Sequence, residues 1–214
     1  MSSDVKELVS ILLKNYKENS QPIDLDKIPI GISGRHIHLS QKDLDALFGK
    51  GYELTPIKDL SQPGQFACKE QLILAGPKGF IEKVRIIGPV RRESQVEILR
   101  SDAFKLGVKP VVRLSGDLEN TPGINIIGPN GAVKISQGVI VSQRHIHLSK
   151  SQAEGRGLKN GDIVSIRLSG MRGGIMENVA VRAGEGSYLD CHLDQEEANA
   201  FGLTSKDYAQ IIKQ

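Results

Sequence analysis

The chain has 214 residues, which is enough for one large domain or two small ones, each with its own apolar core. Its formal net charge of +3 is small, and its lysines and arginines are spread along the sequence, which excludes the dense basic stripe of a nucleic-acid-binding protein. Two cysteines are too few for a disulfide scaffold, no segment approaches the roughly 20 apolar residues of a membrane span, and the N-terminus lacks the pattern of a secretory signal. We therefore expect a cytoplasmic protein that binds neither nucleic acid nor membrane.

The first predicted element is an amphipathic helix over residues 4–16, where apolar side chains recur every three or four positions. A polar, proline-containing linker follows it. From Ile28 onward, short runs rich in β-branched residues alternate with Gly, Pro and Asn turns, and these runs predict strands. Short helices are predicted after each His motif, around Gln41–Phe48 in the first copy, and near Gln195–Phe201. The clearest predicted strands cover residues 72–75, 84–87, 139–141 and 163–168.

The strongest signal is an internal repeat. The hexapeptide Arg-His-Ile-His-Leu-Ser occurs at residues 35–40 and again, unchanged, at residues 144–149, an offset of 109. A weaker similarity continues at an offset of 95, so the first copy carries a longer insertion. A duplicated unit of about 80–100 residues has the size of a small barrel, which predicts a mainly β fold of two similar β-barrels packed side by side.

The repeat suggests a division of the chain into three parts. We assign residues 1–27 to the N-terminal helix and linker, residues 28–120 to the first barrel repeat, and residues 121–214 to the second. The two repeats could exchange strands, and one interleaved barrel built from both halves is an open alternative.

All five histidines lie in the repeated hexapeptide or in the segment that closes the second repeat; they are His36, His38, His145, His147 and His192. On a strand, residues i and i+2 point to the same side, so each His-x-His presents two imidazoles to one point. Neutral imidazole is the commonest metal ligand, and the duplication predicts two metal sites. The alternative is a pair of surface or hydrogen-bonded histidines in each copy.

The repeat also predicts the third ligand of each site, because Glu97 aligns with His192 at the offset of 95. We expect His36, His38 and Glu97 to form one site, and His145, His147 and His192 the other. Three protein ligands with an open position are typical of catalytic zinc, although other divalent metals are possible. The cysteines are poorer candidates: Cys191 should lie on the opposite strand face from His192, and Cys68 is most simply a small buried residue.

Two arginines precede the predicted ligand Glu97. If the strand is regular, Arg91, Glu93, Gln95 and Glu97 share one face, so Arg91 points toward the metal. Its planar guanidinium suits a phosphate. The alternative is a surface pair formed by Arg91 and Arg92 beside a turn.

With these residues assembled, the chain resembles the PduL-type phosphate acyltransferases. The resemblance runs from about Ile28 to the C-terminal region. It rests on the hexapeptide at residues 35–40, Pro63-Gly-Gln65, Gly88-Pro89, Ser94-Gln-Val-Glu97, Thr121-Pro-Gly123, the segment 139–149, Gly161-Asp162, His192-x-Asp194 and Glu197-Ala-Asn199.

The resemblance implies two β-barrels with two zinc ions between them, held by the two ligand sets above, with Arg91 binding phosphate. It implies the reversible conversion of propanoyl-CoA or acetyl-CoA and phosphate into acyl phosphate and coenzyme A. Because the histidines are committed to metal, we expect direct metal-assisted attack of phosphate on the thioester. The residues that bind coenzyme A are not assigned. The resemblance further implies a homo-oligomer in the bacterial cytoplasm, with the bacterial microcompartment as a possible location.

Three alternatives remain at this point. Two open metal sites could serve a hydrolase that uses water on a thioester or phosphoester. A cupin-like metal-binding module also carries His-x-His on a strand, but the usual nearby Glu is missing, since Asp43 follows His38 and Glu154 comes too late after His147. The N-terminal helix could either cap a barrel or dock on a microcompartment shell or core enzyme.

Overall fold

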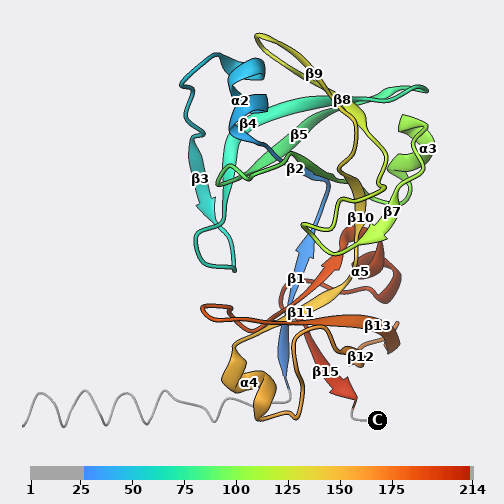
Figure 1. Cartoon of the computed structure of the whole chain (residues 1–214). Helices are drawn as coiled ribbons and strands as arrows, with labels where there is room; N and C mark the ends of the chain where they lie inside the picture. The colour runs from blue at the N-terminus through green and yellow to red at the C-terminus, as the bar shows by residue number, and fades with distance from the viewer. Residues whose placement is uncertain (1–26, 213–214) are drawn as a thin grey trace, which may run out of the picture.

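The computed structural model describes residues 27–212, and these residues form a mainly β protein. The C-terminal half builds a closed barrel, seen in the lower part of Figure 1. Its strands follow the order β1 (Ile28–Ser33), β14 (Asp190–Asp194), β11 (His145–Leu148), β13 (Gly174–Ala183), β12 (Ile163–Leu168) and β15 (Tyr208–Ile212). The predicted mainly β class and the presence of a barrel are thus confirmed.

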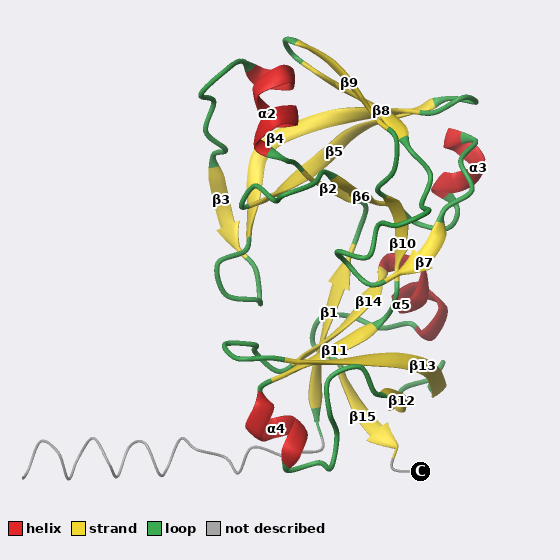
Figure 2. Cartoon of the chain, in the orientation of Figure 1, coloured by secondary structure: helices red, strands yellow, loops and turns green. Residues whose placement is uncertain are grey.

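A nine-stranded sheet, built mostly by the first repeat, takes the place of the first predicted barrel (Figure 2). Its order is β7 (Val111–Arg113), β10 (Val139–Ser142), β6 (Gln95–Glu97), β2 (His36–His38), β5 (Phe80–Gly88), β4 (Phe66–Ala75), β8 (Ile124–Gly128) and β9 (Gly131–Ile135), and β3 (Pro56–Asp59) pairs with β4. Four of these strands and two in the barrel contain the runs expected from the sequence or the His-x-His motifs, while β8 and β9 form an additional hairpin.

The two sheets exchange one strand each. β1 pairs in parallel with β14, placing Gly31 beside His192, and β10 pairs in parallel with β6, placing Ile140 beside Glu97. Gly31 and Ile140 are related by the offset of 109, so the two pairings are equivalent. In Figure 1 the blue strand β1 accordingly lies with the orange and red strands of the barrel. This exchange ties the two sheets together, and β8, β9 and β10 also lie with the first sheet although they follow residue 120.

The same symmetry relates the pairings around the repeated motif. β2 lies parallel to β5 with Ile37 beside Ile86, and β11 lies parallel to β13 with Ile146 beside Val181. The longer insertion of the first copy falls between α2 (Gln41–Phe48) and β4, where the chain forms β3 and the loop 60–65. The corresponding link in the second copy, between α4 (Lys150–Glu154) and β12, contains no strand.

Each letter of the hexapeptide has the same structural role in both copies. Its arginine pairs with an acid on a later helix: Arg35 with Asp102 at 2.8 Å and Arg144 with Glu197 at 2.7 Å. Its isoleucine and leucine are buried in the two apolar cores. Its serine caps the next helix, which satisfies a backbone N–H that the first helical turn leaves unpaired. The invariance of the hexapeptide therefore has a physical cause at every position, since both histidines face the site described below.

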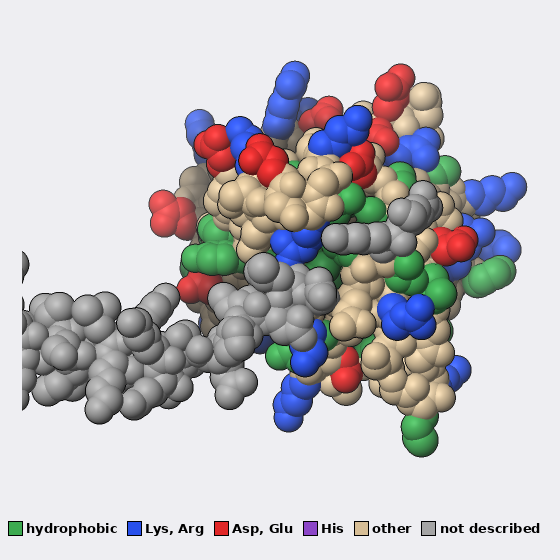
Figure 3. Space-filling view, turned by 90° about the horizontal axis from the view of Figure 1, so that it is seen from below, with side chains coloured by type: hydrophobic (Ala, Val, Ile, Leu, Met, Phe, Trp, Pro, Cys, Tyr) green, Lys and Arg blue, Asp and Glu red, His purple; other side chains and the backbone are tan. Residues whose placement is uncertain are grey.

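The predicted helices Gln41–Phe48 and Gln195–Phe201 are present as α2 and α5, and α4 is the short helix expected after the second His motif, while α3 (Asp102–Leu106) is an additional one. The predicted helix over residues 4–16 lies outside the described residues. Within residues 27–212, no helix is both long and apolar enough to cross a membrane. On the face shown in Figure 3, Lys and Arg side chains are scattered among Asp and Glu side chains.

Candidate metal and phosphate site

Strand pairing places the predicted ligands in two matching squares of side chains. In the first sheet β2 and β6 are antiparallel, so His36 lies opposite Glu97 and His38 opposite Gln95. In the barrel β11 and β14 are antiparallel, so His145 lies opposite His192 and His147 opposite Asp190. Because alternate residues of a strand share a face, all four side chains of each square point to one side.

The first group consists of His36, His38 and Glu97, all buried. His36 Nε2 lies 3.5 Å from Glu97 Oε1, and the two imidazole rings stand edge to face with centroids 4.9 Å apart. One ligand atom from each residue lies within 4.8 Å of the others. A single cation between them could contact all three.

The second group consists of His145, His147 and His192 and meets the same 4.8 Å limit. His145 Nε2 and His147 Nε2 are 3.2 Å apart, and the three ring centroids are 4.8–5.0 Å from one another. The structure therefore brings together both predicted sets of ligands, each from two adjacent strands.

Backbone carbonyls hold three of the imidazoles by Nδ1. His36 Nδ1 is 2.9 Å from Gly34 O, His145 Nδ1 is 2.8 Å from Gln143 O, and His38 Nδ1 is 3.0 Å from Ile87 O. A carbonyl can only accept, so these contacts place a proton on Nδ1 and leave Nε2 free to bind a metal. This arrangement is the usual outer support of a metal-binding histidine.

Burial and charge keep most of these imidazoles neutral. The pKa of His38 falls to about 3 because of burial and the charges of His36 and Arg91. Burial and the neighbouring histidines also lower the pKa of His145 to about 4 and of His147 to about 3. A metal ligand must be unprotonated, so these three rings are ready to bind a cation at neutral pH.

His36 and Glu97 form the exception. Burial lowers the pKa of His36, but the charge and hydrogen bond of Glu97 outweigh burial and raise it. Burial raises the pKa of Glu97, but His36 and the other nearby positive groups outweigh burial and lower it. Glu97 is therefore an ionised carboxylate, a suitable oxygen ligand beside two nitrogens.

Both groups line one cavity of about 210 Å³ between the two sheets. Arg91 lines it as well, and its Nη1 donates to Ser115 Oγ at 2.9 Å. The regular strand expected over residues 91–97 is wrong, because β6 starts only at Gln95 and Glu93 is exposed. Arg91 reaches the cavity from a single bridge to Ser40 instead, while Arg92 is exposed.

Several residues of this cavity were missed by sequence reasoning. Arg182 lies beside His147 on β13, and it aligns with Ile87 in the first copy, so the repeat carries no signal for it. Ser115 accepts hydrogen bonds from both Arg91 and Gln95. Gln62 and Gln65 come from the inserted loop 60–65, whose position depends on tertiary contacts. The cavity thus holds two arginines near the two ligand groups.

A neighbouring groove of about 360 Å³ shares part of its lining with this cavity, including His36 and His192. Arg35 and Arg85 lie along it. Residues of the inserted loop 60–65 line part of this groove. Ser61 Oγ of this loop lies 3.4 Å from His192 Nε2. An elongated ligand in this groove could reach the ligand groups.

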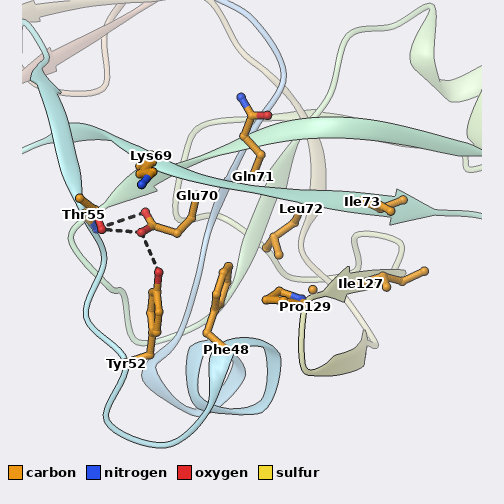
Figure 4. A pocket seen from close by; sticks show the side chains of 11 residues that line it. Phe48, Tyr52, Thr55, Lys69, Glu70, Gln71, Leu72, Ile73, Ile127 and Pro129 are labelled. Carbon is orange, nitrogen blue, oxygen red and sulfur yellow. Dashed lines mark hydrogen bonds between the residues drawn. The ribbon is translucent and has the colours of Figure 1, made fainter.

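A separate pocket lies around β4 and contains none of the predicted ligands (Figure 4). Its buried carboxylate, Glu70, accepts hydrogen bonds from Tyr52 Oη at 3.0 Å and from the Thr55 backbone N–H. These partners account for Glu70 as a structural residue.

The cysteines take no part in either group. Both are buried thiols, and Cys191 packs in the barrel core on the strand face opposite His192, as expected. Burial raises the pKa of Cys68 to about 11 and of Cys191 to about 12, so neither is a thiolate at neutral pH.

Comparison with known proteins identifies the family. Residues 29–204 match the family model described as phosphate propanoyltransferase. A phosphate propanoyltransferase of Thermotoga maritima is 54% identical, over 87% of this chain and 89% of its own length. One from Rhodopseudomonas palustris is 50% identical, over 89% and 84%, and one from Priestia megaterium is 44% identical, over 99% and 94%. The chain therefore belongs to the phosphate propanoyltransferase family.

Proposed function

We propose that this chain transfers an acyl group between coenzyme A and inorganic phosphate, converting acyl-CoA and phosphate reversibly into acyl phosphate and CoA. The observation that carries this proposal is one cavity lined by two open ligand groups and two arginines. Family membership supports the same reaction, with propanoyl-CoA as the first substrate to test and acetyl-CoA as the second.

We further propose two zinc ions per chain, one in each ligand group. The donor sets fit zinc, because two or three imidazole nitrogens and at most one carboxylate leave a coordination position open in each group. Zinc bound there would act as a Lewis acid on substrate oxygen or sulfur.

The charged side chains of the cavity are assigned to phosphate. Arg91 offers a planar fork fixed by its hydrogen bond to Ser115, and Arg182 adds a second positive charge to the lining of the same cavity. The groove along Arg35 and Arg85 is assigned to the acyl-CoA thioester, because it opens into the cavity at His36 and His192. Holding phosphate and thioester together would lower the barrier by about 7 kcal/mol or more.

Direct attack by phosphate is preferred to a covalent acyl-enzyme. The hydroxyl of Ser115 is hydrogen-bonded to Arg91 and Gln95, and the histidines of the cavity are assigned to metal. A serine nucleophile would need a free general base within hydrogen-bonding reach.

The decisive test measures CoA release from propanoyl-CoA and acetyl-CoA with and without phosphate, together with zinc content. We expect release to require phosphate and to yield acyl phosphate. Release of equal rate without phosphate would favour the two-metal hydrolase, and bound metal without turnover would favour a cupin-like binding module.

We also propose that the chain works in the bacterial cytoplasm as a homo-oligomer, and that its N-terminal segment directs it into a microcompartment. The support is the apolar periodicity of residues 4–16 and the polar linker after it. Deleting residues 1–20 should leave phosphate-dependent CoA release unchanged and abolish association with sedimenting particles. Insoluble protein after the deletion would instead indicate that the segment caps the barrel.

A further inference from the structure

Asp190 occupies the fourth corner of the second ligand square. Gln95 occupies the same corner of the first square, and the two residues are related by the offset of 95. Each stands two residues before the third ligand, so both side chains point to the ligand side of their strands.

Each of these two corner residues makes a hydrogen bond that suits the ligand beside it. Gln95 Nε2 donates to Glu97 Oε1 at 2.7 Å, so an amide donor meets a carboxylate. Asp190 Oδ2 lies 2.9 Å from His192 Nε2, so a carboxylate meets an imidazole. An ionised carboxylate only accepts, which makes Nε2–H the donor and leaves His192 Nδ1 unprotonated. In the first copy the third ligand is a carboxylate and its neighbour donates a hydrogen bond to it. In the second copy the third ligand is an imidazole, and its neighbour is the carboxylate that accepts the hydrogen bond.

The charge of the two squares is also matched. The first contains two imidazoles, an amide and the Glu97 carboxylate; the second contains three imidazoles and the Asp190 carboxylate. Each square therefore supplies one negative charge near its cation.

The backbone of β1 lies so close to this pair that no side chain would fit at Gly31. A Cβ at Gly31 would lie 2.8 Å from His192 Cδ2 and 2.9 Å from Asp190 Oδ2. Asp190 is buried, with 5% of its surface exposed. The Asp190–His192 pair is therefore fixed between β1 and β11 and is not a chance surface contact.

We propose that Asp190 is the positioning residue of the second metal group, fixing the tautomer and orientation of His192 and supplying the negative charge that Glu97 supplies in the first. This inference rests on the proposed zinc sites. Outer carboxylates of this kind, bonded to a metal-binding histidine, change metal affinity by about 10–100-fold when replaced.

The test compares zinc retention by wild-type protein and Asp190→Asn during titration with a chelator. We expect the wild type to hold two zinc ions per chain, and Asp190→Asn to lose one of them at a chelator concentration about 10–100-fold lower. The other ion, which is held by the first ligand group, should stay as tightly bound as in the wild type, because the first square is unchanged.

The chain supplies its own rescue and control variants. The double variant Asp190→Gln/His192→Glu copies the Gln–Glu pair of the first square and should retain two zinc ions better than Asp190→Asn. Glu70→Gln makes the same carboxylate-to-amide change at a buried site that lines a separate pocket (Figure 4), and it should leave zinc retention unchanged.

Equal zinc retention by Asp190→Asn and the wild type would overturn the inference while leaving the zinc sites intact. A crystal structure of the zinc-loaded protein with an Asp190 oxygen about 2.0–2.2 Å from the ion would also overturn it, because Asp190 would then be a ligand itself. A wild-type protein that binds no zinc would reject the proposed metal sites and this inference with them.

Discussion

The single variants His36→Asn and His145→Asn should each lose one of the two proposed zinc ions, and each should lower turnover by about 100- to 1,000-fold. The size follows from the several kcal/mol of transition-state stabilisation that a catalytic metal supplies, with about 1.4 kcal/mol for each tenfold change in rate. Both residues hold the same position in their copies, with Nδ1 bonded to a backbone carbonyl and Nε2 facing the cavity. The measurement is zinc per chain by elemental analysis, together with phosphate-dependent CoA release.

The control for this pair is Cys191→Ala, which changes the residue next to His192. Its thiol packs in the barrel core, on the other side of the strand from the ligands. We expect two zinc ions and near-normal turnover, with some loss of stability from the smaller core side chain. Full activity of a His145→Asn protein that has lost one zinc ion would contradict the proposed mechanism.

The sequence predicted which side chains come together because the repeat relates equivalent positions in the two sheets. The alignment of Glu97 with His192 implies that the two residues hold equivalent positions, and the structure places each opposite the first histidine of its motif. The short helices Gln41–Phe48 and Gln195–Phe201 were predictable for a local reason, since serine or aspartate caps and apolar spacing lie within a few residues of each other.

The exchange of β1 and β10 could be raised only as an alternative. Both strands pair in parallel with partners from the other copy, and Ile30 lies beside Cys191 across 161 residues of sequence. A short apolar strand carries no information on which of two similar sheets it will join. The first predicted barrel was not found for a related reason, because β8 and β9, which follow residue 120, extend that sheet along β4.

The parts of the cavity that break the repeat were not predictable. Arg182 replaces an isoleucine of the first copy, and the inserted loop 60–65 reaches His192 and Tyr188 only through the fold. These differences give two similar ligand squares different surroundings. Arg91 follows a strand of the nine-stranded sheet and Arg182 lies on a barrel strand, so both halves of the fold contribute a positive charge to the cavity lining.

Arg91→Ala should lower kcat/KM for phosphate by about 10- to 100-fold while two zinc ions stay bound. The size corresponds to the loss of one hydrogen-bonded charged contact, about 1.5–3 kcal/mol. Zinc should stay because Arg91 bonds to Ser115 and belongs to neither ligand group. Arg91→Lys should recover only part of the loss, since an ammonium keeps the charge but not the planar fork. Initial rates over a range of phosphate concentrations, with zinc analysis of the same samples, measure both effects.

Arg92→Ala is the matched control, because it removes the same charge from the next residue. Arg92 is exposed and does not line the cavity, so its loss should change kcat/KM for phosphate by less than about threefold, within the range of a screened surface charge. Equal damage from both alanine variants would mean that phosphate responds to the overall charge of this segment. Loss of zinc from Arg91→Ala would mean that Arg91 supports the ligand groups. Only a large phosphate-specific effect at residue 91, with zinc retained, fits a guanidinium that contacts the attacking phosphate.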